Sequence, residues 1–84
     1  MNIKEFSEDD IKVGETYWFR WFRSVGGGAL KRTVIEIGSP HKRLLRYRKP
    51  SGSEHEIDIR NFVKIYRSNG ISEEEAKKEV FHHD

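Results

Sequence analysis

The sequence of 84 residues contains no cysteine, and this absence removes several kinds of chemistry at once. Without cysteine the chain has no disulfide framework, no thiolate metal site and no cysteine nucleophile. The composition suits a reducing compartment, where disulfides are rare. A chain of this length has room for one domain with a modest hydrophobic core, so we expect modest stability.

Long apolar runs are also missing from the sequence. No stretch approaches the roughly 20 consecutive apolar residues that a helix needs to cross a bilayer. The first residues, MNIKEF, lack the apolar segment of a secretion signal. We therefore expect a cytoplasmic protein without a membrane partner.

The sequence also lacks the motifs of catalysis and cofactor binding. The run Gly26–Gly28 is not followed by the lysine and the Ser/Thr of a phosphate-binding loop. Residues His82–Asp84 have metal-ligating side chains, but a frayed chain end gives them no fixed geometry. We expect a protein that is not an enzyme and that has no cofactor and no metal.

Charge of both signs is abundant, and it is distributed unevenly around a net charge of +2. Residues 15–67 contain 12 Lys/Arg against five Asp/Glu, whereas residues 1–14 and 68–84 have net charges of −2 and −3. A basic body attracts polyanions over about a Debye length. Acidic ends either screen that body or bind partners of their own.

Runs of aromatic and β-branched residues, separated by glycine- and proline-containing breaks, predict five strands within residues 15–67. These strands are Thr16–Val25, Ala29–Ile37, Arg43–Lys49, Ser53–Arg60 and, after a helical turn at Arg60–Phe62, Val63–Tyr66. Successive strands joined by short turns predict an antiparallel meander of hairpins.

The first 14 residues are a lead-in to this β region. Ser7–Asp10 has the composition of a capped helical turn. We expect Ile11 and Val13 to pack on the core after it.

Residues 68–84 form an acidic C-terminal piece. Ser72 and Glu75 have the spacing of a capping box, in which each side chain reaches the backbone of the other residue. This pattern predicts a short helix from Glu73 to about Phe81, marginal on its own.

The register of the first hairpin follows from a three-residue loop, Gly26–Gly28, which pairs Val25 with Ala29. This register puts aromatic residues of the first strand opposite apolar or β-branched residues on one face, which we expect to be core. The pairs are Tyr17–Ile37, Phe19–Ile35 and Trp21–Thr33. A slip by one residue places Arg32 in the core series, and this favours the register chosen.

The second hairpin has a loop of the same length, Pro50–Gly52, which pairs Lys49 with Ser53. This register puts apolar pairs on one face and opposite charges on the other. The pairs are Leu45–Ile57, Tyr47–His55, Arg46–Glu56 and Arg48–Glu54. We expect Gly52 to adopt positive φ.

Five antiparallel strands with a helical turn before the last strand resemble the SH3-like small barrel, the architecture of SH3, Tudor and KOW-type domains. The resemblance covers residues 11–67 and is one of topology. It implies a mainly β fold, a small five-stranded antiparallel barrel with a short C-terminal helix. A small OB-like barrel is the rival interpretation.

The second face of the first hairpin mixes aromatic and basic residues and is the candidate binding site. Exposed rings stack on bases at about 1–3 kcal/mol each, and cations bind phosphates. Cations at and beside the third strand that have no carboxylate opposite them extend this site. The candidate residues are Trp18, Arg20, Phe22, Arg23, Lys31, Arg32, Lys42, Arg43 and Lys49.

A purely structural interpretation competes with this one. The C-terminal helix, which carries Val80 and Phe81, would cover Trp18 and make a second small core. Phe22 and Arg32 would then simply stack on each other.

The leading hypothesis is a small accessory module that binds nucleic acid, DNA or RNA, or a protein that handles it. The alternative is a stand-alone protein-interaction module, an inhibitor or adaptor that docks on another protein, because Trp, Phe and Arg are favoured at interfaces. A lone small barrel is a common format of phage-encoded regulators. A third use of exposed aromatic residues is a homodimer interface, so the oligomeric state stays open.

Overall fold

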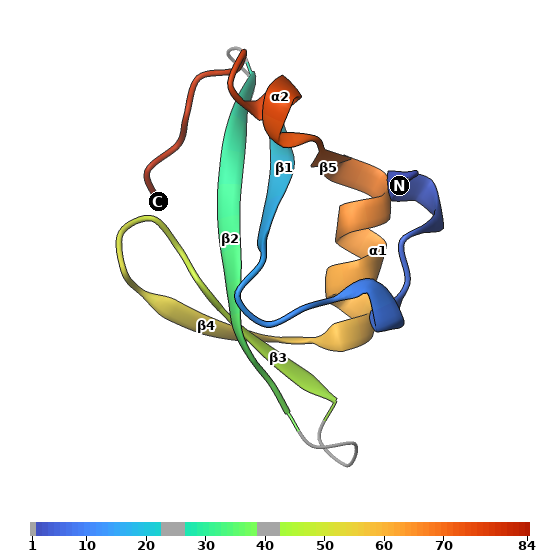
Figure 1. Ribbon diagram of the computed structural model, residues 1–84. Helices are drawn as coiled ribbons and strands as arrows, with labels where there is room; N and C mark the ends of the chain where they lie inside the picture. Colours follow the sequence, from blue (N-terminus) through green and yellow to red (C-terminus); the bar gives the residue numbers. More distant parts are fainter. Residues whose placement is uncertain (1, 23–26, 39–42) are drawn as a thin grey trace.

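The structure is a computed structural model that describes residues 2–22, 27–38 and 43–84, with the backbone alone at residues 21, 22 and 27. Five strands form one antiparallel sheet, and a helix packs across one face of it (Figure 1). The elements are β1 (Thr16–Phe22), β2 (Gly27–Ile37), β3 (Leu44–Arg48), β4 (Glu54–Asp58), α1 (Ile59–Asn69), β5 (Gly70–Ile71) and α2 (Glu73–Ala76), preceded by 3-10 turns at Ile3–Glu5 and Glu8–Asp10.

The strand order is β4-β3-β2-β1-β5, so the described sheet has β4 and β5 at its edges and is not closed. The predicted mainly β, antiparallel five-stranded fold with a short helix is confirmed. The SH3-like barrel, which requires closure, is not confirmed. No helix in the described ranges is long and apolar enough to cross a membrane.

The second hairpin has the predicted register. Tyr47 pairs with His55 and Leu45 with Ile57, and the Lys49 N–H donates to the Ser53 carbonyl at 2.9 Å. Gly52 has a φ of +95°, a conformation that a residue with a Cβ rarely adopts. The two cross-strand ion pairs are also present, Arg46–Glu56 at 3.4 Å and Arg48–Glu54 at 3.1 Å.

The predicted register of the first hairpin is wrong. Thr16 pairs with Thr33 and Phe22 with Gly27, so the last two glycines of the predicted loop belong to β2. The shift exchanges the two faces of β2, and Val34, fully buried, takes the core position predicted for Ile35. A β-bulge between Val34 and Glu36 then brings Ile37 opposite Leu45.

The predicted helical turn at Arg60–Phe62 is helical, but it continues through residues 63–66, so the fifth strand predicted there is wrong. These residues lie within α1, which begins where the Asp58 side chain accepts a hydrogen bond of 2.8 Å from the Arg60 N–H. Helical spacing puts four apolar residues on one face, toward the sheet. They are Ile59, Phe62, Val63 and Tyr66. The fifth strand is instead Gly70–Ile71, paired with β1.

Five aromatic rings meet edge to face between α1 and the sheet, with centroids 4.6–5.6 Å apart. They are Phe6, Tyr17, Phe19, Phe62 and Tyr66. Phe6 is fully buried, so the lead-in contributes to this core. The 3-10 turn after Phe6 is the predicted one, and the Ser7 N–H donates to the Asp10 carboxylate at 2.8 Å.

Of the two apolar residues expected to pack on the core after the first helical turn, only one does so. Ile11 is buried as predicted, but Val13 is 58 % exposed and does not pack on the core.

The Ser72 hydroxyl accepts from the Glu75 N–H at 3.2 Å, which confirms the predicted N-cap. The helix that it starts, α2, ends at Ala76 and does not extend to Phe81.

Candidate nucleic-acid interface

Trp18 lies in a second, smaller apolar cluster on the side of the sheet away from α1. It packs on Ala29, Ile71 and Ala76, and its ring centroid is 5.9 Å from that of Phe81. The Lys31 ammonium lies 5.8 Å from the centre of the Trp18 ring. The chain after α2 therefore partly covers Trp18, as in the interpretation that gives this face a purely structural role.

Arg20 shares the face of Trp18, and two carboxylates from the C-terminal piece surround it. Its guanidinium lies 3.4 Å from Glu75 and 3.5 Å from Glu79. All three side chains are partly exposed, so each ion pair contributes little to stability. A phosphate group that binds Arg20 must displace these carboxylates.

The predicted register places Arg32 on the same face of the sheet as Trp18. In the actual register Arg32 pairs with Tyr17, so it lies on the opposite face. Its guanidinium lies 5.5 Å from the centre of the Tyr47 ring and donates to both Asp84 carboxylate oxygens, at 2.9 and 2.6 Å. Lys49 lies 3.7 Å from the same carboxylate. Asp84 therefore pairs with two of the predicted site residues at once.

These neighbours shift the pKa of the Asp84 carboxyl. Burial raises its pKa, but the hydrogen bonds and charge of Arg32, followed by the charges of Lys49 and His82, outweigh burial. The net pKa of Asp84 lies below its usual value.

The remaining predicted site residues do not come together in the described structure. Arg43 forms an ion pair with Glu8 of the lead-in. Arg23, Lys42 and the side chain of Phe22 lie outside the described residues. Within the described ranges, no group of three potential metal ligands lies close together.

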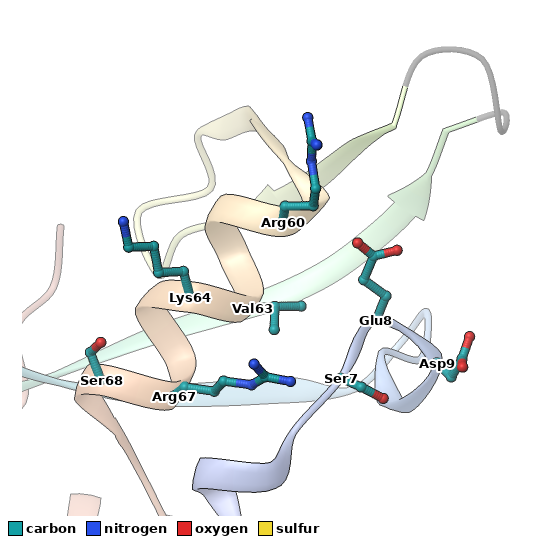
Figure 2. A pocket seen from close by; sticks show the side chains of 8 residues that line it. All are labelled: Ser7, Glu8, Asp9, Arg60, Val63, Lys64, Arg67 and Ser68. Atoms are coloured by element: carbon teal, nitrogen blue, oxygen red, sulfur yellow. The ribbon is translucent and has the colours of Figure 1, made fainter.

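The solvent face of α1 is a basic surface that the sequence prediction missed. Arg60, Lys64 and Arg67 lie along it, and α1 contains no acidic residue. Figure 2 shows these side chains beside a groove of about 620 Å³ between α1 and the 3-10 turn Glu8–Asp10. We call Arg60, Lys64 and Arg67 the helix cations.

The helix cations differ from Arg20, Arg32, Arg43 and Lys49 in how they are paired. Arg60 is highly exposed, at 71 % of its side chain, and its Nε lies 3.5 Å from the Asp58 carboxylate. Arg67 points across the groove, and its Nε donates to the Phe6 carbonyl at 2.5 Å (Figure 2). Among the described residues, no carboxylate lies within 4.0 Å of the Lys64 ammonium or the Arg67 guanidinium.

The sequence contains a signal for this surface, although the composition of Val63–Tyr66 predicts a strand there. Asp58 is a good N-cap residue, and the apolar positions 59, 62, 63 and 66 have helical spacing. The same spacing places residues 60, 64 and 67 together on the opposite face.

No family model, no curated protein and no solved structure matches this chain.

Proposed function

We propose that this chain binds nucleic acid, and that the helix cations on the solvent face of α1 contact the phosphates. The observation that carries the proposal is the contrast in pairing between α1 and four of the cations predicted to form the site. Arg20, Arg32, Arg43 and Lys49 each face a carboxylate of the same chain, whereas Lys64 and Arg67 face none among the described residues. A cation that faces no carboxylate binds phosphate without first losing an ion pair.

The dimensions of α1 suit a nucleic acid. Arg60 and Arg67 are seven residues apart, which corresponds to about 10 Å along a helix axis. Phosphates follow one another closely along each strand, about 3.4 Å apart along the axis of B-DNA, so these cations can contact different phosphates of one backbone. Asn61 and Ser68, also exposed on α1, add groups that hydrogen-bond to phosphate or sugar oxygens.

The acidic residues beside the groove limit the direction of approach. Glu8 and Asp9 lie on the side of the groove opposite α1 (Figure 2). A polyanion should therefore approach Arg60 and Lys64, which extend away from those carboxylates (Figure 2). This arrangement supports backbone contacts more than base-specific readout, so the proposal covers both DNA and RNA.

A salt titration with matched variants tests this proposal. Labelled single- and double-stranded DNA and RNA are titrated with the unmodified chain, with Arg60→Gln and with Lys64→Gln. Each variant should weaken binding to every nucleic acid that binds, and should reduce the slope of log K against log salt by about 1. Lys77→Gln and Lys78→Gln, exposed cations beyond α2, are the controls and should bind unchanged.

Two results contradict the proposal. One is the absence of detectable binding to any of the four nucleic acids at low salt. The other is an equal loss of affinity in the control variants, which would show that net charge, and not the α1 surface, determines binding. Arg67 is left unchanged in this comparison because its contact with Phe6 also holds the lead-in against α1.

A further inference from the structure

The edge of β2 carries a short segment from the other end of the chain. β3 pairs with β2 over residues 33–37, which leaves the preceding part of the β2 edge for another partner. Residues 80–84, here the tail segment, run along that edge in the parallel direction beside Ala29. The Ala29 N–H donates to the Val80 carbonyl at 2.9 Å, and the His82 N–H donates to the Ala29 carbonyl at 3.0 Å.

Two side chains of the tail segment occupy complementary positions. Phe81 packs against Trp18 of β1. Asp84 reaches a group of three residues that we call the carboxylate clamp, Arg32, Lys49 and Ser51. The clamp joins β2 to the loop between β3 and β4, and the Ser51 hydroxyl donates to the Asp84 main-chain carbonyl at 2.7 Å.

The clamp requires a negatively charged partner. The Arg32 side chain is 12 % exposed, and an unpaired charge at such a position is unfavourable. An unpaired strand edge is also a template for a further strand. A segment that fits this edge therefore needs an extended backbone, an aromatic side chain and a carboxylate three residues after the aromatic one.

The tail segment itself makes few apolar contacts. Phe81 packs on Trp18, whereas Val80 contributes little because it is 76 % exposed. Segments with few buried apolar contacts open at low free energy. In Figure 1 it passes from α2 to the β3–β4 loop, on the other side of β1 and β2 from α1.

We propose that this edge is a binding site for an extended segment of a partner protein, with an aromatic residue three positions before a carboxylate. The tail segment occupies the site in the isolated chain and is displaced by the partner segment. The backbone hydrogen bonds of Ala29 supply affinity, and Trp18 and the carboxylate clamp supply specificity, as in other cases of strand addition. The site is separate from the α1 surface and does not depend on nucleic-acid binding.

The test supplies the segment in trans. A labelled peptide with the sequence of residues 79–84, EVFHHD, is acetylated and amidated so that it carries no terminal charges. Its binding to the full-length Asp84→Asn chain is measured by fluorescence anisotropy, because that substitution weakens the internal competitor. We expect the peptide to bind Asp84→Asn about tenfold more tightly than the unmodified chain.

Further arms assign the contacts. A peptide ending in asparagine should lose about tenfold in affinity for Asp84→Asn. The double variant Arg32→Gln, Asp84→Asn should no longer distinguish the two peptides. Adding Arg48→Gln to Asp84→Asn is the matched control, because Arg48 pairs with Glu54 and should leave peptide binding unchanged.

The proposal is overturned if the peptide binds Asp84→Asn no better than the unmodified chain. It is also overturned if the Arg32→Gln double variant still prefers the acidic peptide while circular dichroism shows a native fold. If the Arg32→Gln, Asp84→Asn variant unfolds, the double variant Lys49→Gln, Asp84→Asn tests the clamp in its place. A dimer of the unmodified chain in light scattering, abolished by Asp84→Asn, would assign the site to the tail of a second copy and exclude a foreign partner.

Discussion

Arg32 and Asp84 are separated by 52 positions in the sequence, and their side chains are joined by two hydrogen bonds of 2.9 and 2.6 Å. This pair occurs in a register of β1 and β2 that differs from the predicted one. The actual register moves Arg32 to the core side of the sheet, which is unfavourable for an unpaired charge. Asp84 supplies the missing partner, and Tyr47 packs under the guanidinium.

The first prediction concerns the strength of this pair. Both side chains are largely buried, at 12 % and 19 % exposure, so a double-mutant cycle of Arg32→Gln and Asp84→Asn should give a coupling free energy above about 1 kcal/mol. The exposed pair Arg48–Glu54 is the control and should give a coupling below about 1 kcal/mol. Urea unfolding of the four chains of each cycle measures both values. Equal coupling in the two pairs would contradict this ranking.

The second prediction follows from the lowered pKa of Asp84. A carboxyl whose pKa is lower in the folded state stabilises the fold above its unfolded value, about 3.9, and this contribution is lost as the pH falls through the folded value. The tail segment should therefore detach below about pH 4. The chemical shifts of the His82 amide and the Phe81 ring should titrate together with a midpoint below 3.9.

Asp58 also has a lowered pKa, chiefly because its carboxylate accepts a hydrogen bond from the Arg60 backbone N–H, and it titrates in the same pH range. Asp84→Asn separates the two groups. In that variant the acid-dependent shift at His82 should disappear, whereas a shift at the Arg60 amide should remain. A midpoint above the ordinary aspartate value would contradict the prediction.

The sequence predicted the second hairpin correctly because all the interactions that set its register are local. Gly52 determines the turn, and the cross-strand pairs Tyr47–His55 and Arg48–Glu54 are spaced by that turn. In the first hairpin, by contrast, Arg32 lies on the core side and its partner Asp84 is far away in the sequence. A rule that keeps arginine out of the core series therefore favoured the wrong register there.

The candidate site was only partly predictable for a related reason. Trp18 and Arg20 share a face, as predicted. Phe81 packs on Trp18 and Glu79 pairs with Arg20, and both belong to the segment that follows α2 and returns to β2. The composition of residues 63–66 is compatible with a strand. The helical spacing of the apolar positions from 59 to 66 competes with that composition, and packing of the Tyr66 ring on Phe6 and Tyr17 favours the helix.

The third prediction compares the two tyrosines of the aromatic core. The Tyr17 hydroxyl accepts from the Lys12 N–H at 3.0 Å and donates to the Asp10 carbonyl at 3.3 Å, so it fixes the lead-in. Tyr17→Phe should lower the free energy of unfolding by about 1 kcal/mol. Tyr66→Phe should change it by less than about 0.5 kcal/mol, because the Tyr66 ring supplies packing and its hydroxyl forms no hydrogen bond with the described residues.

Chemical unfolding in urea measures both changes, and the unfolding slope shows whether two-state behaviour is kept. An equal loss in the two variants would contradict the assigned role of the Tyr17 hydroxyl.

The fourth prediction concerns stability at alkaline pH. Burial raises the pKa of both Tyr17 and Tyr66, with the Lys12 hydrogen bond opposing this rise in Tyr17. A group with a raised folded pKa stabilises the fold below its unfolded value, about 10, and this contribution is lost as the pH rises through the folded value. Stability should therefore decline above about pH 10, and Tyr66→Phe should reduce that decline. Thermal unfolding between pH 8 and pH 11, about one unit or more either side of the tyrosine value, measures it.

The fifth prediction concerns Gly70, at the junction of α1 and β5. Its φ of −67° is available to any residue, so the requirement for glycine is one of space. A Cβ at this position would lie 2.3 Å from the Tyr66 carbonyl oxygen and 2.7 Å from the Tyr66 ring. Tyr66 cannot move aside easily, because its ring centroid is 4.6 Å from that of Phe6 in the packed core.

Gly70→Ala should therefore lower the free energy of unfolding by about 1–3 kcal/mol, the range of an overpacked core. Gly52→Ala is the matched control, because a Cβ there has open space and the positive φ alone opposes it, at about 1 kcal/mol. The two variants also differ in location. Gly70→Ala should shift the NMR signals of the Tyr66 and Phe6 rings, whereas Gly52→Ala should shift signals at the β3–β4 loop alone. A stable Gly70→Ala chain with unchanged aromatic signals would show that α1 does not end against β1 as described.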